Sequence, residues 1–130
     1  MAFNLLIVDD SATTRTIIKR ILELSTIEIG ELYEAEDGEA ALDLLQEKWI
    51  DLVFADINMP RMNGVEMVQR MSEDGMLKSI PVVVVSSEGS ETRIEEMMSK
   101  GIKAYLRKPF TPENIKELAE SILKPNEGGQ

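Results

Sequence analysis

Apolar positions along the chain alternate between short continuous runs and helical stripes about five times. The runs at residues 5–8, 52–55 and 81–85 are continuously apolar, as strands covered on both faces of a sheet should be. The segment at residues 32–36 alternates instead, so we expect it at an edge of the sheet. The pattern predicts strands over residues 4–8, about 31–36, 51–56, 81–86 and 103–107.

Apolar residues at helical spacing predict a helix after each of these strands. The last helix has the clearest start, with Thr111 as N-cap and Pro112 at its first position. Gly101 is expected to end the helix before it, and at least one of Met97 and Met98 is expected in the core. The apolar residues at this spacing are Ile17, Ile18, Ile21, Leu22 and Leu24; Ala41, Leu44 and Leu45 after Asp37-Gly38; Val65, Val68 and Met71 after Gly64; Ile94, Met97 and Met98 after Ser90; and Ile115, Leu118, Ala119 and Ile122, the expected buried face of the last helix.

Five strand–helix units joined by right-handed crossovers predict an α/β fold: an open, doubly wound parallel sheet with helices on both faces. The length of 130 residues suits one domain with a buried core. We expect that domain over residues 1–125, followed by a short flexible tail at residues 126–130. Sheets of this kind bind ligands just beyond the carboxyl ends of their strands.

Polar side chains follow four of the predicted strands. Asp9 and Asp10 come after the first strand, Asp56 ends the third, Ser86 ends the fourth and Lys108 follows the fifth. Taken singly, each has an ordinary interpretation as a helix cap, a solvated loop or turn residue, or a surface lysine. Because the carboxyl ends of neighbouring parallel strands meet at one edge, their coincidence favours a shared crevice.

The polar side chains expected in this crevice suit the binding of a divalent cation and a phosphoryl group. Carboxylates packed together repel one another unless a cation compensates, and Mg²⁺ needs only one or two carboxylates besides a phosphate. A carboxylate can also attack phosphorus to form an aspartyl phosphate. Asp56, alone on its strand, suits this nucleophile, and the Asp9-Asp10 pair suits the metal. Lys108 could supply a positive charge and Ser86 a hydrogen bond to the phosphoryl group.

The composition of the chain excludes several classes of partner and of catalytic site. A net charge of −10 argues against nucleic acid and anionic membrane as partners. The absence of Cys and His excludes disulfides and thiol or Ser-His catalysis, and argues against zinc; any phosphohistidine must belong to a partner. No run approaches the roughly 20 apolar residues of a membrane helix, and there is no signal-peptide pattern. We therefore expect no membrane insertion and a cytoplasmic location.

Four motifs lie at the predicted strand ends: Val8-Asp9-Asp10-Ser11; Asp56-Ile57-Asn58-Met59-Pro60 with Met62-Asn63-Gly64; Ser86; and Lys108-Pro109-Phe110. In order and spacing they resemble the receiver domain of two-component response regulators, over essentially the whole chain. The resemblance implies a flavodoxin-like sheet with the strand order 2-1-3-4-5. It also implies a protein that is not an enzyme acting on other substrates, but a phosphoacceptor that catalyses only its own phosphorylation and dephosphorylation.

The resemblance also assigns roles at the site. Asp56 would accept the phosphoryl group, and Asp9, Asp10, Asp56 and the backbone carbonyl of Asn58 would bind Mg²⁺, or Mn²⁺ in its place. Lys108 is the lysine of the family pattern. Its bond to Pro109 is predicted to be cis, a conformation that X-Pro bonds adopt at modest cost.

Two further pairs of positions are implied. Ser86 and Tyr105 would form the switch, in which the aromatic ring turns inward as the hydroxyl moves toward the phosphate; a half-buried strand aromatic would look the same in sequence. Ser86 stands where Thr is commoner, so its coupling to Tyr105 is expected to be looser. Asn58 and Glu88 match the residue types of single-domain chemotaxis regulators, where they modulate the lifetime of the phosphate, and we expect rapid self-dephosphorylation.

The implied partners are a sensor histidine kinase and a downstream target that docks on residues 91–123. Lys100, Lys103 and Arg107 give this surface positive charge that an acidic or amphipathic partner helix could bind; the alternative is that they form only a solvated rim. The protein is expected to be a monomer. Three alternatives remain: a Mg²⁺-dependent phosphohydrolase with an aspartate nucleophile, a receiver fragment of a larger response regulator, and a flavin- or nucleotide-binding module. The first typically carries an acid where Asn58 stands, and the third lacks its glycine-rich fingerprint.

Overall fold

The computed structural model describes residues 2–87, 89 and 91–124. Within these residues, five strands alternate with five helices, as the pattern predicted. The elements are β1 (Phe3–Val8), α1 (Ala12–Glu23), β2 (Ile29–Ala35), α2 (Gly38–Glu47), β3 (Leu52–Ala55), α3 (Gly64–Ser72), β4 (Val82–Ser86), α4 (Glu91–Ser99), β5 (Ala104–Arg107) and α5 (Pro112–Leu123).

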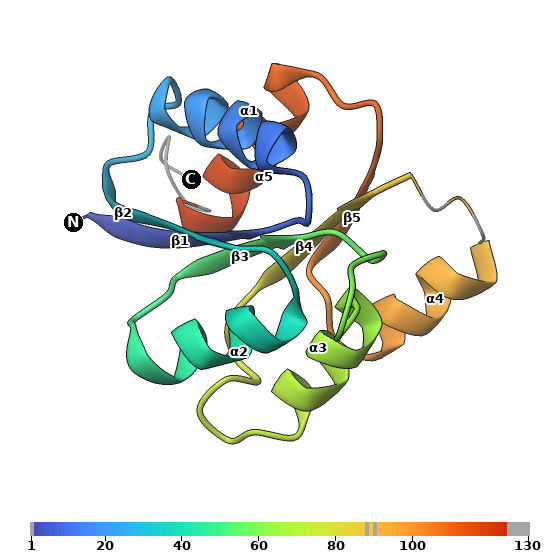
Figure 1. The fold of residues 1–130 in the computed structure, drawn as a ribbon. Coiled ribbons are helices and arrows are strands. Elements are labelled where there is room, and N and C mark those ends of the chain that lie inside the picture. Colours follow the sequence, from blue (N-terminus) through green and yellow to red (C-terminus); the bar gives the residue numbers. More distant parts are fainter. Residues whose placement is uncertain (1, 88, 90, 125–130) are drawn as a thin grey trace.

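The strands form a parallel sheet in the order β2-β1-β3-β4-β5, which confirms the predicted topology. β2 lies at an edge, as its alternating sequence indicated (Figure 1). At the carboxyl end of the sheet, Val8 pairs with Ala35 on one side and Ala55 on the other, and Ala55 pairs with Val84. This register brings the residues that follow β1 and β3 side by side at the carboxyl end of the sheet.

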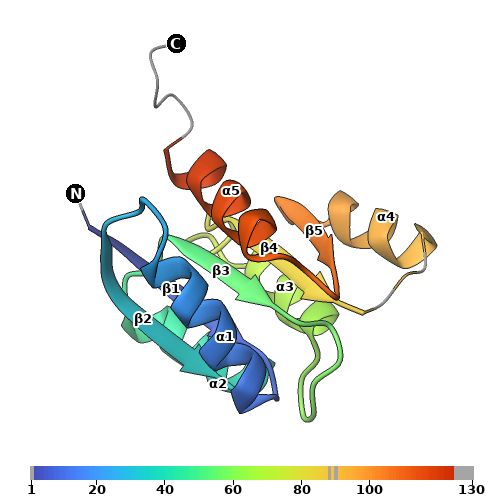
Figure 2. The ribbon, with the colours of Figure 1, turned by 90° about the horizontal axis from the view of Figure 1, so that it is seen from above.

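Helices cover both faces of the sheet. Figures 1 and 2 show α1 and α5 on one face and α2 and α3 on the other. Because successive strand side chains point to opposite faces, Leu5 and Ile7 pack in the cluster on the α1–α5 side, whereas Leu6 and Val8 pack in the cluster on the α2–α3 side. Two apolar layers therefore hold the strand ends in place.

The helix boundaries follow local chemistry. Thr111 caps α5 by accepting a hydrogen bond from Asn114 N, and Pro112 begins the helix, as predicted. Asp37 caps α2 in the same way, accepting from Ala40 N. Gly101 follows α4 with a φ of +100°, a backbone conformation that favours glycine, and this confirms the predicted stop signal.

Only part of the apolar stripe that predicted α1 is buried. Ile18, Ile21 and Leu22 are buried, but Ile17 is 46% exposed and Leu24, which lies past the helix as its C-cap, is 75% exposed. The five apolar residues span more than one helix face, and only the position of the sheet decides which of them is covered. On α4, Met97 is fully buried and Met98 is exposed, so one of the two methionines is in the core, as expected.

None of the helices formed by the described residues is long and apolar enough to cross a membrane. The helix expected after Ser90 is α4, which begins at Glu91. Two predictions fall on residues outside those described: the role of Glu88 and the flexible tail at residues 126–130. The division into a domain over residues 1–125 and a tail therefore stays a prediction.

Candidate functional site

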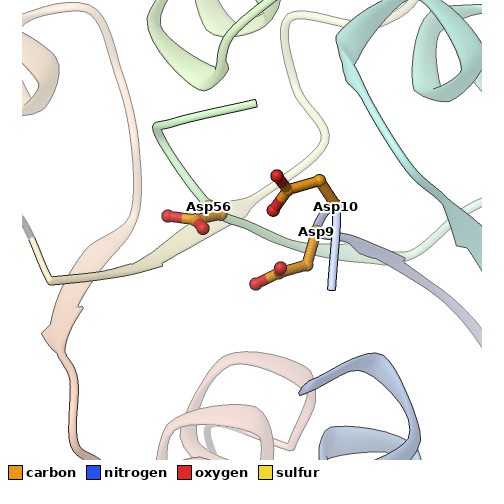
Figure 3. A group of neighbouring side chains, drawn as sticks. All are labelled: Asp9, Asp10 and Asp56. Carbon is orange, nitrogen blue, oxygen red and sulfur yellow. The ribbon is translucent and has the colours of Figure 1, made fainter. Parts of the chain in front are cut away.

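Three carboxylates meet at the carboxyl ends of β1 and β3. Oxygens of Asp9, Asp10 and Asp56 lie within 4.8 Å of one another, and Figure 3 shows the three side chains beside each other. Asp9 and Asp56 are buried, with 3% and 8% exposure, whereas Asp10 is exposed. The backbone holds the pair of strands in register here, because Asp56 N donates to Val8 O at 2.9 Å.

Lys108 reaches this group from the segment that follows β5. Its Nζ lies 3.1 Å from Asp9 Oδ2 and 3.3 Å from Asp56 Oδ2. Its backbone N–H donates to Ser86 O at 2.8 Å, which ties the end of β4 to the same place. The Lys108–Pro109 peptide bond is cis, as predicted. The structure thus brings together the predicted carboxylates, the lysine and the strand that ends in Ser86.

Both buried carboxylates are held in fixed orientations. Asp9 Oδ1 accepts from Ser11 N at 2.8 Å and Asp56 Oδ1 accepts from Ile57 N at 2.7 Å. The second oxygen of each carboxylate is the one that contacts Lys108. A group held in this way needs little reorganisation when a reactant binds.

The charges of the site are not balanced within this group. Burial raises the pKa of Asp9 above its ordinary value, and the charge of Asp56 adds to this rise, while the Ser11 N–H and Lys108 oppose it. Burial alone would lower the pKa of Lys108, but the charges of Asp56 and Asp9 and their hydrogen bonds outweigh it and raise that pKa. One ammonium faces three carboxylates that offer only oxygen ligands, a donor set that suits a hard divalent cation such as Mg²⁺ or Mn²⁺.

The two predicted switch residues lie on neighbouring strands. Ser86 is the last residue of β4 and is fully buried. Tyr105 lies on β5 opposite Val84, is half-buried, and packs against the apolar cluster on the α2–α3 side. Asn58 is exposed in the loop between β3 and α3, two residues after Asp56. The roles that the resemblance implies for these residues stay predictions.

Arg15 was not predicted from the sequence to contribute to the site. Its Nη1 donates to Asp9 O at 2.6 Å and its Nε donates to Glu34 Oε1 at 2.8 Å, so it anchors the end of β1 to β2. Its place in the first turns of the helix after two aspartates was the available signal. That signal does not distinguish it from a surface arginine, because the partner Glu34 lies on a different element.

Gly64 in the third motif has a steric role. A Cβ at this position would lie 2.2 Å from Asp56 O, and Gly64 N donates to Ile57 O at 2.7 Å. The start of α3 therefore packs directly against the backbone of Asp56, which only a residue without a side chain permits.

Comparison with known proteins agrees with this geometry. The model of the response regulator receiver domain family matches residues 5–120. The chemotaxis protein CheY homolog of Campylobacter jejuni is 36% identical over 126 residues, which are 96% of this chain and 95% of that protein. The structure of chemotaxis response regulator CheY4 of Vibrio cholerae has a TM-score of 0.84 and 29% identity, over 94% of this chain and 99% of that chain.

A second solved structure, the Mn²⁺-bound form of response regulator Rcp1, has a TM-score of 0.82 and 26% identity, and covers 93% of this chain and 94% of that chain. The family match spans the elements that carry all four motifs. The chain therefore belongs to the response regulator receiver domains, the phosphorylation-dependent switches of two-component signalling, as its motifs indicated.

Proposed function

We propose that Asp56 accepts a phosphoryl group from a phosphohistidine of a sensor kinase, and that the phosphorylated form signals by binding another protein. The observation that carries the proposal is the contact of Lys108 with both Asp56 and Asp9 beside a third carboxylate. The 130 residues contain no His, which supports a donor outside this domain.

Asp9, Asp10, Asp56 and the backbone carbonyl of Asn58 would hold a Mg²⁺ ion. Support comes from the clustered carboxylate oxygens and from the solved relative whose structure contains Mn²⁺. When bound, the cation supplies positive charge that neutralises the oxygens of the transferring phosphoryl group.

The residues of the chain perform the remaining steps. A carboxylate oxygen of Asp56 bonds to phosphorus while the phosphorus–nitrogen bond breaks, and the imidazole leaves with the electron pair. Lys108 moves its contact from the carboxylate to the phosphoryl oxygens, and the Ser86 hydroxyl donates a hydrogen bond to them. The inward position of Ser86 then favours an inward Tyr105, so phosphorylation shifts a two-state equilibrium.

The output surface would be α4, β5 and α5, residues 91–123, with a protein of acidic or amphipathic character as the target. Exposed Met98 offers a soft apolar contact, and Lys103 and Arg107, within the same range of residues, are also exposed. The relatives' names support a chemotaxis pathway. The net charge of −10 supports a partner other than nucleic acid. We place the protein in the cytoplasm as a monomer that catalyses only its own phosphorylation and dephosphorylation.

The central test replaces Asp56 by Asn. We expect Asp56→Asn to abolish phosphate incorporation from a small phosphodonor, because the amide is not a nucleophile. Asp43→Asn, at an exposed aspartate of α2, is the matched control and should incorporate phosphate normally. Incorporation by Asp56→Asn at the normal level would refute the assignment.

Asn58 and Glu88 are proposed to control the access of attacking water to the phosphoryl group on Asp56. The phosphoprotein should therefore lose its phosphate rapidly in Mg²⁺, and an aspartyl-phosphate lifetime of hours would contradict that role.

A further inference from the structure

The loop between β3 and α3 is tied to the start of α2 by two separate links. Arg61 donates through its guanidinium to Asp37 and forms an ion pair with it, and its Nη2 also lies 3.3 Å from Glu36 Oε1. In addition, Gly38 N donates to Met62 O at 2.9 Å. These links join two segments that β3 separates in the sequence.

Asp37 is a buried anchor for this contact. Its side chain is only 2% exposed, and its two oxygens serve different partners: Oδ1 accepts from Ala40 N at 2.8 Å and Oδ2 faces Arg61. The pKa of Asp37 lies below its ordinary value because of the Ala40 N–H and the neighbouring Arg61. The carboxylate therefore caps α2 and holds the loop at the same time.

The loop backbone is constrained at the same point. Arg61 has a φ of +63°, in the left-handed region that a residue with a side chain seldom adopts. At Gly38, a Cβ would lie 2.9 Å from Met62 O, so the two backbones are in direct contact. A strained conformation of this kind persists only where the surroundings hold it.

Asn58 lies between the two fixed ends of this loop. The first end is the hydrogen bond from Gly64 N to Ile57 O at 2.7 Å, and the second is the attachment of Arg61 and Met62 to α2. Removing the Arg61–Asp37 pair leaves the second end attached only through the Gly38 N–Met62 O hydrogen bond and the buried Met62 side chain, so the backbone at Asn58 is held less firmly. Its carbonyl would then have to be ordered when a cation binds, at a cost in affinity.

We infer that Arg61 and Asp37 are positioning residues that set the affinity of the acidic site for its divalent cation, by holding the loop that carries Asn58. This inference rests on the proposed cation site at Asp9, Asp10, Asp56 and the Asn58 carbonyl. Neither Arg61 nor Asp37 belongs to that ligand set, so each would act through the loop.

The test measures Mg²⁺ binding to the whole protein by calorimetry, without any phosphodonor. We expect Arg61→Ala and Asp37→Asn each to weaken Mg²⁺ binding roughly tenfold. Asparagine is as good an N-cap as aspartate, so the second variant keeps the start of α2. Arg70→Ala, at an exposed arginine of α3, is the control and should bind Mg²⁺ as the unmodified protein does.

The signs of the two effects separate positioning from simple electrostatics. Removing the Arg61 charge makes the protein more negative and would by itself tighten Mg²⁺ binding, whereas removing the Asp37 charge would weaken it. Weaker binding in both variants, with a double variant no worse than either single one, supports the inference. Arg61→Lys, which keeps the charge but not the planar fork, should also weaken binding and guards against a folding defect in the alanine variant.

Unchanged or tighter binding in Arg61→Ala would overturn the inference, while normal phosphorylation at Asp56 would leave the proposed function intact. Failure of the unmodified protein to bind Mg²⁺ would overturn both. The Asn58 amide signal offers an independent readout, since it should broaden or shift in Arg61→Ala before any metal is added.

Discussion

Contacts of single residues decide whether the site can form. Lys108 bridges Asp9 and Asp56 at 3.1 and 3.3 Å, and a backbone N–H fixes the other oxygen of each carboxylate. Both acids are therefore oriented before any ligand arrives. Gly64 contributes through the side chain that it lacks, since it lets α3 begin against the backbone of Asp56.

Replacing Gly64 by Ala should therefore destabilise the protein by about 2 kcal/mol, the cost of overpacking a close contact. The added Cβ would lie 2.2 Å from Asp56 O, so α3 or the end of β3 must move. Gly75→Ala is the matched control, because a Cβ there meets nothing within 4 Å, and its stability should change by less than about 0.5 kcal/mol. Urea unfolding of the two variants measures both; equal stabilities would show that the contact at Gly64 yields easily.

Links between elements hold β2 at the edge of the sheet. Glu34 on β2 accepts from Arg15 Nε at 2.8 Å and from Lys19 Nζ at 2.9 Å, and both donors lie on α1. These hydrogen bonds hold the pKa of Glu34 below its ordinary value of 4.5. Because Arg15 also donates to Asp9 O, the same group of charges connects the edge strand to the site.

The stability of the protein should depend on pH through this glutamate. A carboxyl whose pKa is lower in the folded state stabilises the fold above its unfolded pKa, and that stability is lost as the pH falls through the folded pKa. Glu34→Gln should thus be less stable above pH 4.5, by less than about 1 kcal/mol for so exposed a pair. The difference from the unmodified protein should shrink in acid. Glu117→Gln on the exposed face of α5 is the control; a difference that grows in acid would exclude this role of Glu34.

In the whole molecule, the site lies at the carboxyl end of the sheet, between the apolar layers that cover its two faces. Site residues come from the ends of β1, β3 and β4 and from the segment after β5, so the complete sheet is needed to assemble them. A ligand that binds across these strand ends should therefore stabilise the entire domain by mass action.

Beryllofluoride, an analogue of the phosphoryl group, tests whether a ligand at this site stabilises the whole domain. Together with Mg²⁺, at a hundred times its dissociation constant, it should add about 2.7 kcal/mol to the free energy of unfolding and so raise the midpoint of thermal unfolding. It should also shift the resonances around Tyr105. Mg²⁺ and fluoride without beryllium form the control, and Asp56→Asn should not respond to the analogue. A protein that shows no response would not be a receiver that works through Asp56.

Much of this molecule could be predicted from local pattern. The continuous runs, the alternation at the edge strand, the capping of α5 by Thr111 and the stop at Gly101 each depend on neighbours in sequence, and each is confirmed. The strand order is also confirmed, but it came from the resemblance to a known family, because periodicity alone does not order strands.

Spacing and residue type were enough to predict the elements, the class of fold and the polar residues at the strand ends. The folded structure was needed to show that Ile18 rather than Ile17 is buried, that Lys108 bridges two aspartates from different strands, and that Arg61 pairs with Asp37. One cause underlies all three. Burial and ion pairing depend on which surfaces the folded chain brings together, and residues far apart in sequence carry no local sign of their partners.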